Sequence, residues 1–293
     1  MPLISVIIPT YNRPQRITEC LSALAALNFS PEQFEVIVVD DGGCLEVHSA
    51  INNLNSAVDL TVVRQDHAGA AQARNTGAAS AQGQYLVFLD DDCLPEREWL
   101  AALATRLERG EMEAVAGQTV NGCPQNLYDC ASHLLSYHQY DSYKTAGAPV
   151  EFLATNNLAM QAELFHTVGG FDPNFILAYE DRDFCDRWLR FGYRLTYIPE
   201  AVVRHCRSMT LRSFCRQHWT YGRMASHYYN LADKQTSSRM HRHLPRLYLD
   251  VARSALREHG IWNALPVIAL VAVSQAIAAA GFVTERVFWT PER

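Results

Sequence analysis

Three consecutive aspartates, Asp90–Asp92, follow directly after a short apolar segment, Gln84–Leu89. A run of aliphatic, β-branched and aromatic residues of this length is typical of a buried strand. Carboxylates released together at one strand end repel each other, and a bound divalent cation is the simplest compensation. In open α/β sheets, the carboxyl ends of the strands are also where ligands bind. The alternative is a solvated acidic turn that opens the next helix, because carboxylates also favour helix N-termini.

The first half of the chain alternates strand and helix patterns. Strands are expected at 3–8, 34–39, 58–63 and 84–89, and helices at 14–26 and 70–80. This alternation, with continuous apolar strands, predicts an α/β fold with a mainly parallel sheet and helices on both faces. Polar residues follow three of the strands, so we expect three polar clusters along one sheet edge, at 10–13, 40–41 and 90–92.

The second half is less regular. We expect a helix and a long loop within 121–150, and a helical chain from about 239 to the end. Between these segments lie the patterns of short strands at 158–161, 194–198 and 201–205, and of helices at 161–168, 180–191 and 209–232.

The composition of the 293 residues suits a globular protein, because 48% are hydrophobic and can form a sizeable core. The eight cysteines show no C-x-x-C spacing, so we expect reduced, mostly buried thiols of a cytosolic protein and no zinc site. The chain enters a strand pattern at once, so no signal peptide is expected.

Charge is unevenly distributed along the chain. Residues 1–203 hold 12 basic and 26 acidic residues, whereas residues 204–260 hold 11 basic and three acidic ones. The basic segment precedes Ala264–Val283, which has no charge and is rich in alanine. Such a pair of segments suits an anionic partner or membrane surface. The alternatives are a solvated basic face that pairs with the acidic body, and an apolar helix that packs as core; a helix spanning a bilayer is less favoured.

Five segments resemble, in order, the motifs of family-2 glycosyltransferases with the GT-A fold. They are SVIIPTYNR (5–13), VVDDGG (38–43), GAAQARNTGA (69–78), FLDDDCLP (88–95) and VGGFDPNF…YEDRDFCDRW (168–188). The resemblance covers about residues 3–225. It implies a GT-A catalytic domain over 1–232, with a nucleotide-binding half (1–120) and an acceptor half (121–232), followed by a C-terminal helical extension over 233–293.

The resemblance also implies a metal site at the aspartate run. Asp92 would bind Mn²⁺ or Mg²⁺ directly, and Asp90 would contact the ribose or a metal-bound water. Asp91 adds charge, and it departs slightly from the usual motif, which often has an uncharged residue at this position. His205 is a candidate third ligand, although a lone histidine is more often structural.

On the donor side, the resemblance places the loop Pro9, Thr10, Tyr11, Asn12 and Arg13 at the nucleotide. Tyr11 offers a ring for stacking on the base. Asp41 would accept the N–H of a uracil or thymine, and Asp40 would contact the ribose, so UDP or dTDP is the expected nucleotide. Arg74 would contact nucleotide or phosphate, or else pair with a neighbouring side chain.

On the acceptor side, Asp181 would be the general base at the start of helix 180–191, with Glu180 beside it; the alternative is that both residues cap the helix. Asn156 and Asn157 are expected in a polar loop near the donor sugar. Trp219 belongs to a segment that only partly resembles the Q-x-x-R-W signature of processive relatives, because His218 replaces the arginine.

The predicted function is inverting transfer of a sugar from a nucleoside-diphosphate sugar to an acceptor hydroxyl, in cell-surface glycan or glycolipid synthesis. The expected partners are the donor, a glycan or lipid-linked acceptor and the cytoplasmic face of a membrane, without nucleic acid. A nucleotide-sugar-binding protein without transferase activity is the alternative, and a hydrolase that uses water as acceptor is a third option.

Overall fold

The computed structural model describes residues 2–43, 58–138, 150–231 and 244–288. They form two compact units. The described parts of the first unit lie within Met1–Gly122, Lys144–Ile176 and Glu180–Cys206, and those of the second within Cys123–Tyr143, Leu177–Tyr179 and Arg207–Arg293. Helix α8 (Leu211–Leu231) thus groups with the C-terminal helix, whereas the sequence placed a boundary at 232/233; that domain assignment stays a prediction.

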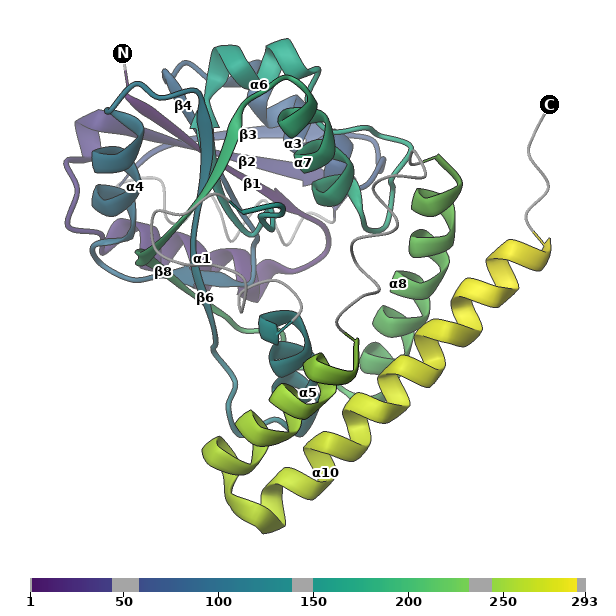
Figure 1. Ribbon diagram of the computed structural model, residues 1–293. Coiled ribbons are helices and arrows are strands. Elements are labelled where there is room, and N and C mark those ends of the chain that lie inside the picture. Colours follow the sequence, from purple (N-terminus) through teal and green to yellow (C-terminus); the bar gives the residue numbers. More distant parts are fainter. Residues whose placement is uncertain (1, 44–57, 139–149, 232–243, 289–293) are drawn as a thin grey trace. The chain divides into compact units, whose positions relative to one another are not determined.

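The first unit contains an eight-stranded sheet with the order β3-β2-β1-β4-β7-β6-β8-β5 (Figure 1). Strands β1 to β4 are parallel, β7 is antiparallel to both of its neighbours, and β5 is antiparallel to β8. The strands are β1 (Ile4–Thr10), β2 (Phe34–Asp41), β3 (Asp59–Gln65), β4 (Tyr85–Leu89), β5 (Cys93–Pro95), β6 (Glu113–Asn121), β7 (Asn157–Gln161) and β8 (Arg194–His205).

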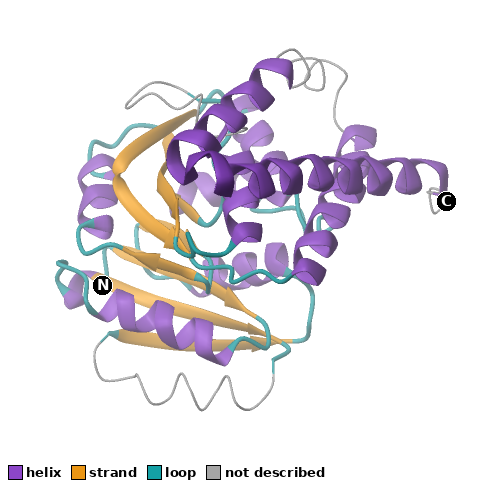
Figure 2. Ribbon diagram, turned by 90° about the horizontal axis from the view of Figure 1, so that it is seen from below, coloured by secondary structure: helices purple, strands orange, loops and turns teal. Residues whose placement is uncertain are grey.

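Helices cover both faces of this sheet (Figure 2). Alternate residues of a strand point to opposite faces, so Val36 and Val38 of β2 join the core under α1 and α4, whereas Ile37 and Val39 pack with Ala73 of α3. Phe88 of β4 contacts Phe165 of α6 and Phe171 in the loop that follows α6. The helices are α1 (Pro14–Ala25), α3 (Ala70–Ser80), α4 (Trp99–Leu107), α6 (Ala162–Val168) and α7 (Glu180–Arg190), with a 3-10 turn η1 (Pro31–Gln33).

The sheet register aligns the strand ends that carry polar residues. Thr10 at the end of β1 lies opposite Asp40 of β2, and Ile7 lies opposite Phe88 of β4, two residues before Asp90. The chain runs from β1 to β2 in one direction along the sheet and to β4 in the other, which creates the crevice where open α/β sheets bind ligands. The predicted clustering of polar residues at one edge is therefore confirmed.

The second unit is helical. Its core joins α5 (Leu127–Ser136), α8 and α10 (Leu244–Phe288). The α10 span is broken at Gly260, whose backbone is not helical (φ 69°, ψ 165°). Beyond this break α10 approaches α8 closely, because a Cβ on Gly222 would lie 1.9 Å from the carbonyl oxygen of Ala278. Arg223 of α8 also pairs with Glu285 of α10 at 2.6 Å.

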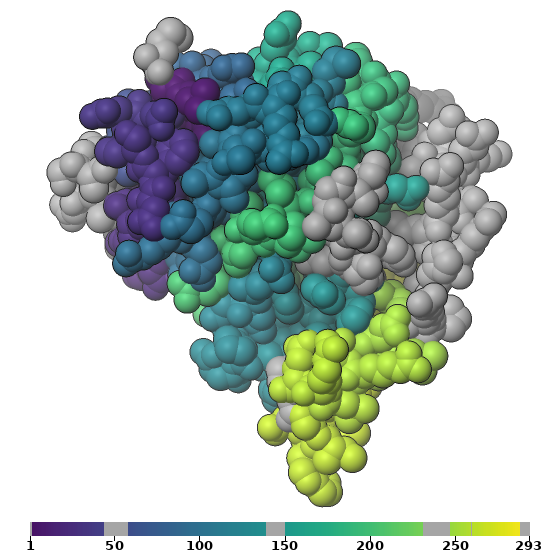
Figure 3. Space-filling view, turned by 60° about the vertical axis from the view of Figure 1, so that its left-hand side comes forward, coloured from purple at the N-terminus to yellow at the C-terminus, as the bar shows by residue number. Residues whose placement is uncertain are grey.

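The part of α10 after the break is apolar on its outer side as well. Gly260–Val287 has a mean hydropathy of 2.1 over its most apolar window, of which only 22% is buried, and its length and composition would allow it to cross a membrane. Trp262 is 83% exposed, and Ile261 and Leu265 beside it are also exposed. The yellow-green surface at the bottom of Figure 3 belongs to α10.

The predicted α/β fold with a C-terminal helical segment is confirmed, and the boundaries of the predicted elements agree within a few residues. The sequence patterns did not indicate β5, α4 or β6. They also split β8 into two strands, because Pro199 interrupts the pattern; the structure accommodates it as an irregularity where β8 pairs with β6. Cys44 and the segments 139–149 and 239–243 lie outside the described residues, and the described cysteines are free thiols.

Candidate active site

The loop after β1 is tied to the middle aspartate of the run. Thr10 Oγ1 donates to Asp91 Oδ2 at 2.8 Å, and Arg13 Nη1 donates to Asp91 Oδ1 at 3.0 Å. Asp91 is buried, and desolvation raises its pKa to about 6, against the opposing effect of Arg13. Asp91, which had no predicted role beyond its charge, thus anchors the β1 loop against the end of β4.

The first aspartate of the run is held by a buried arginine. Arg74 of α3 donates from Nη2 to Asp90 Oδ1 at 2.7 Å and from Nη1 to Glu180 Oε1 at 2.8 Å. The guanidinium therefore connects the strand-end aspartates to the start of α7. This pairing is the alternative that the sequence left open for Arg74, except that the side chain is buried, 3% exposed, and not on the surface.

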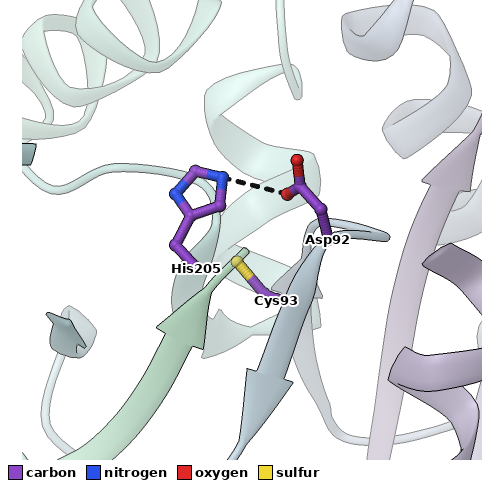
Figure 4. Close-up of side chains that lie close together, drawn as sticks. All are labelled: Asp92, Cys93 and His205. Atoms are coloured by element: carbon purple, nitrogen blue, oxygen red, sulfur yellow. Dashed lines mark ion pairs between the residues drawn. The ribbon is translucent and has the colours of Figure 1, made fainter. Parts of the chain in front are cut away.

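The third aspartate pairs with the histidine at the end of β8. Asp92 Oδ1 lies 2.9 Å from His205 Nε2 (Figure 4), and both side chains are mostly buried. The Asn156 amide lies 3.3 Å from His205 Nδ1. This contact lies on the Nδ1 side of the ring and leaves Nε2 facing Asp92. Asp90 and Asp91 thus pair with arginines, whereas Asp92 pairs with the His205 imidazole and, at 3.4 Å, with Arg13.

This pair fits a divalent cation. A carboxylate oxygen and an imidazole nitrogen at contact distance can turn to one ion, and that donor set suits Mn²⁺ and similar ions, which accept both ligand types. The predicted ligands Asp92 and His205 are thus brought together. Ligation itself stays a prediction.

The end of β2 holds the loop before α3. Asp41 Oδ1 accepts from Gln65 Nε2 at 2.7 Å and from the amide of Ala68 at 2.8 Å, and Oδ2 accepts from the amide of Gly69 at 2.9 Å. Asp40 Oδ1 accepts from the amide of Gly43 at 2.6 Å. Both aspartates therefore shape the loops that would surround a nucleotide.

A histidine occupies the place where the sequence predicts base stacking. The His67 ring stacks on Tyr11, with centroids 4.2 Å apart and an interplanar angle of 19°. Its Nδ1 lies 2.9 Å from Asp41 Oδ2. Tyr11 and Asp41, the two residues predicted to recognise the base, are thus brought together around one imidazole ring.

The two carboxylates at the start of α7 differ in environment. Glu180 is bound by Arg74, whereas Asp181 Oδ1 accepts a hydrogen bond from the backbone amide of Arg182 at 2.8 Å. Burial and the neighbouring Glu180 raise the pKa of Asp181 to about 7, against the opposing effect of Arg74. A carboxylate with this pKa is suited to accept a proton near neutral pH.

The remaining predicted residues divide between the two units. Pro9 ends the apolar part of β1, and Asn12 has a positive φ of 55° that turns the loop. Asn157 begins β7 and does not lie in a polar loop: its buried side chain accepts from Trp99 Nε1 and donates to the carbonyls of Gln118 and Ala201. Trp219 lies on α8 in the second unit, one-third exposed.

Sequence reasoning missed two residues of this site. His67 follows β3 in a polar turn that carries no motif, and Cys93 was taken only as a buried thiol. The signal for Cys93 was its position next to Asp92. Its relation to His205 follows only from the pairing of β5 with β8, which the sequence did not predict.

The profile of Glycosyl transferase family 2 matches residues 5–166, more than half of the chain. The chain therefore belongs to glycosyl transferase family 2. The match includes the loop after β1, the β2 end, α3 and the aspartate run, and it ends before α7 and His205.

Several curated proteins are similar over most of this chain. Glycosyltransferase AglE of Haloferax volcanii is 28% identical over 214 residues, 70% of this chain and 67% of AglE. Validoxylamine A glucosyltransferase of Streptomyces hygroscopicus subsp. limoneus is 30% identical over 70% of this chain, and O-antigen chain rhamnosyltransferase WbaN of Salmonella anatum is 25% identical over 76% of it. The matches span 50% of the Streptomyces protein and 72% of WbaN.

Solved structures show the same fold. The mannosyltransferase PcManGT from Pyrobaculum calidifontis, in complex with GDP-Man and Mn²⁺, has a TM-score of 0.69 at 22% identity, over 99% of this chain and 88% of PcManGT. TarS 1–349 of S. aureus in complex with UDP has a TM-score of 0.55 at 19% identity, over 96% of this chain and 92% of that chain. The GT-A fold expected from the sequence is confirmed.

Proposed function

We propose that the chain is an inverting glycosyltransferase that moves a sugar from a nucleoside-diphosphate sugar to an acceptor hydroxyl, with Asp181 as the base. The observation that carries this proposal is the environment of Asp181. Asp181 has a pKa of about 7 and lies in the first turn of α7. Glu180, the first residue of α7, is joined through Arg74 to Asp90 at the strand-end site. Family membership supports the reaction type.

The reaction needs one base and one leaving group. The acceptor oxygen attacks the anomeric carbon while its proton passes to Asp181, and the nucleoside diphosphate leaves with the electron pair of the broken bond. Attack opposite to the leaving group inverts the configuration at that carbon. A positioned base of this kind contributes roughly 10²–10⁴-fold to the rate.

Asp92 and His205 would hold Mn²⁺ or Mg²⁺ at the donor diphosphate. When bound, the cation would neutralise the charge that develops on the leaving group. Arg13 contributes a positive charge at the same place, because its Nη1 lies 3.4 Å from Asp92 Oδ2. Mn²⁺ in the complex of the fold neighbour PcManGT supports the choice of ion.

His67 would occupy the position of the nucleobase when no nucleotide is bound. It stacks on Tyr11 and reaches Asp41, the same two interactions proposed for a uracil or thymine ring. A base with an N–H would therefore replace the imidazole, which favours UDP or dTDP over CDP. The fold neighbours carry both GDP-Man and UDP, so the base must be tested directly.

A ligand panel tests the donor proposal. Thermal stability is measured with UDP, dTDP, GDP, CDP and their sugars, with and without Mn²⁺, because a bound ligand stabilises the folded state by about 2.7 kcal/mol at a hundredfold excess over Kd. UDP or dTDP should give the largest shift. A preference for GDP would contradict a pyrimidine at this position, and a preference for CDP, whose base has no ring N–H, would contradict the role of Asp41. Release of free sugar without transfer would identify a hydrolase. Binding without any turnover would favour the alternative, a nucleotide-sugar-binding protein.

The acceptor would be a glycan or a lipid-linked sugar of the cell surface, and nucleic acid is not proposed as a partner. Support comes from two relatives named as O-antigen chain rhamnosyltransferase and poly(ribitol-phosphate) β-N-acetylglucosaminyltransferase. Trp219, Asn156 and Glu180 remain candidates for the acceptor side. Transfer to lipid-linked and free oligosaccharides, compared at equal concentration, tests this class.

The second unit would bind the cytoplasmic face of a membrane in the plane of the surface. One side of the segment after Gly260 is held by α8 through Ala278 and Glu285, whereas Trp262 and the alanine-rich opposite side are exposed. A helix attached to a charged neighbour along its length suits a surface position better than a spanning one. Arg253 and Arg257 nearby would favour anionic lipid, at about 1 kcal/mol for each basic residue near the surface.

Liposome flotation tests this placement. The protein should float with anionic vesicles, less at high salt, and not with neutral vesicles. Trp262→Ser should weaken flotation, whereas Tyr11→Ser, an exposed aromatic in the other unit, serves as the control. A protein that stays in the soluble fraction with both vesicle types would leave the helix with a structural role only.

A further inference from the structure

A cysteine lies beside the Asp92–His205 pair. A carboxylate oxygen of Asp92, the Sγ of Cys93 and a ring nitrogen of His205 all lie within 4.8 Å of one another. Figure 4 shows the three side chains converging from the turn after β4, from β5 and from the end of β8.

The backbone fixes this arrangement. Cys93 pairs directly with His205 across antiparallel strands, so the two side chains lie on the same face of the sheet. The amide of Cys93 donates to the carbonyl of Asp90 at 3.0 Å, which closes a tight turn, and the amide of Cys206 donates to the carbonyl of Asp92 at 2.8 Å. The three ligand atoms are therefore positioned by main-chain hydrogen bonds and do not need a bound nucleotide.

The chemistry of the three ligands differs from that of a hard-cation site. Mg²⁺ prefers oxygen ligands, and a thiolate adds little to its binding. Zn²⁺ prefers nitrogen and sulfur, and sites with three protein ligands and one open position are common for this ion. Cys93 is fully buried, so its thiol is shielded from bulk reagents, while Asp92 and His205 are each partly exposed and leave a route for an ion.

We propose that Asp92, Cys93 and His205 form a binding site for a thiophilic divalent cation, with Zn²⁺ as the reference ion. Binding forms a metal–sulfur bond, and the thiol proton leaves to solvent. The ion uses the same Asp92 and His205 atoms as the activating Mn²⁺ or Mg²⁺, so it excludes them and lowers transfer. This regulatory consequence rests on the proposed function, whereas the binding itself does not.

Cobalt absorption tests the binding. Co²⁺ replaces Zn²⁺ in such sites, and a cysteine ligand gives a sulfur-to-cobalt charge-transfer band in the near ultraviolet. The full chain should show this band, and Cys93→Ser should lose it. Cys20→Ser is the matched control, because Cys20 is also fully buried and its Sγ lies 3.8 Å from the carbonyl of Asp90, yet it is outside the group. Absence of the band in the wild type overturns the proposal.

Competition titration with a zinc chelator gives the affinity. Cys93→Ser should bind Zn²⁺ at least about tenfold more weakly, since even an outer-shell partner of a metal site is worth roughly 10–100-fold. Mn²⁺ affinity, measured by electron paramagnetic resonance, should change little in Cys93→Ser and fall in Asp92→Asn. Equal Zn²⁺ affinity of the wild type and a folded Cys93→Ser protein also overturns the proposal, because Cys93 is then only a packed thiol.

A measurement of the sugar-transfer rate links the metal site to the proposed activity. Zn²⁺ added to the Mn²⁺-loaded enzyme should lower the rate of the wild type and of Cys20→Ser, and the ratio of rates with and without Zn²⁺ should rise in Cys93→Ser. If no donor and acceptor give turnover, the proposed function fails, while the cobalt spectrum and the zinc titration still decide whether the metal site exists.

Discussion

The acidic residues at the end of β4 and those at the start of α7 have different neighbours, which give them different properties. At the end of β4, Asp90 is paired with Arg74, Asp91 with Arg13, and Asp92 with His205. At the start of α7, Glu180 takes the other side of Arg74, and Asp181 keeps a pKa of about 7. The difference teaches that the neighbouring side chains give each carboxylate of one chain its own environment, and we expect different roles from them as a result.

The largest expected effect concerns Asp181, the proposed base at the start of α7. Asp181→Asn should reduce transfer by roughly 10²–10⁴-fold, because the amide cannot accept the acceptor proton. Donor affinity should stay near that of the wild type. In the wild type, kcat/KM should rise with pH and level off above about 7, because the carboxylate is the active form. Equal losses of donor binding and transfer would contradict the assignment.

The next effect concerns the residue shared by both clusters. Arg74→Gln should destabilise the protein by about 3–5 kcal/mol, because removal of one partner leaves buried carboxylates uncompensated. Arg74 also lowers the pKa of Asp181, so the acidic limb of the pH profile should move to higher pH. Thermal unfolding and the pH profile measure the two effects. Arg74→Lys is the control, because it keeps the charge and should shift the limb less.

Asp92→Asn should reduce transfer by at least about 10²-fold, since one electrostatic contact of this kind is worth roughly 3 kcal/mol. The loss should not be recovered by raising the Mn²⁺ concentration, and Mn²⁺ binding should weaken in parallel. Full activity of the wild type in excess EDTA would show that the cation is not needed.

The smallest effect is expected at Asp91. Its pKa is about 6 in the folded chain and about 3.9 when unfolded, so the folded state holds more protons between pH 4 and 6. Its contribution to the free energy of unfolding therefore falls as pH rises through this window, by roughly 1–3 kcal/mol. Asp91→Asn should remove that slope in metal-free protein, as measured by denaturant titration at several pH values.

The sequence predicted the parts of the fold that depend on neighbouring residues. The strands before Thr10, Asp41 and Asp90 are continuous apolar runs, and their polar ends meet because parallel strands align. The contact of Arg74 with Glu180 was not predictable, because it joins residues 106 positions apart that no local pattern connects. The same holds for Asn157, whose amide binds carbonyls of two other strands.

Short or irregular elements were the other part of the structure that the sequence did not predict. Strand β5 has only three residues and includes Pro95, so it carries no period-2 pattern, yet it sets the relation of Cys93 to His205. His67 was missed for a similar reason, because its role depends on Tyr11 and Asp41, which precede it in the chain by more than twenty residues.

The pairing of β5 with β8 also fixes when the site is completed during synthesis. The ribosome makes about 5–20 residues per second, so Asp92 emerges several seconds or more before His205. The span matched by the family profile ends at residue 166 and contains the aspartates without this histidine. A nascent chain therefore carries the acidic run before its partner exists, and the Asp92–His205 pair can form only after the last strand of the sheet, β8, has been made.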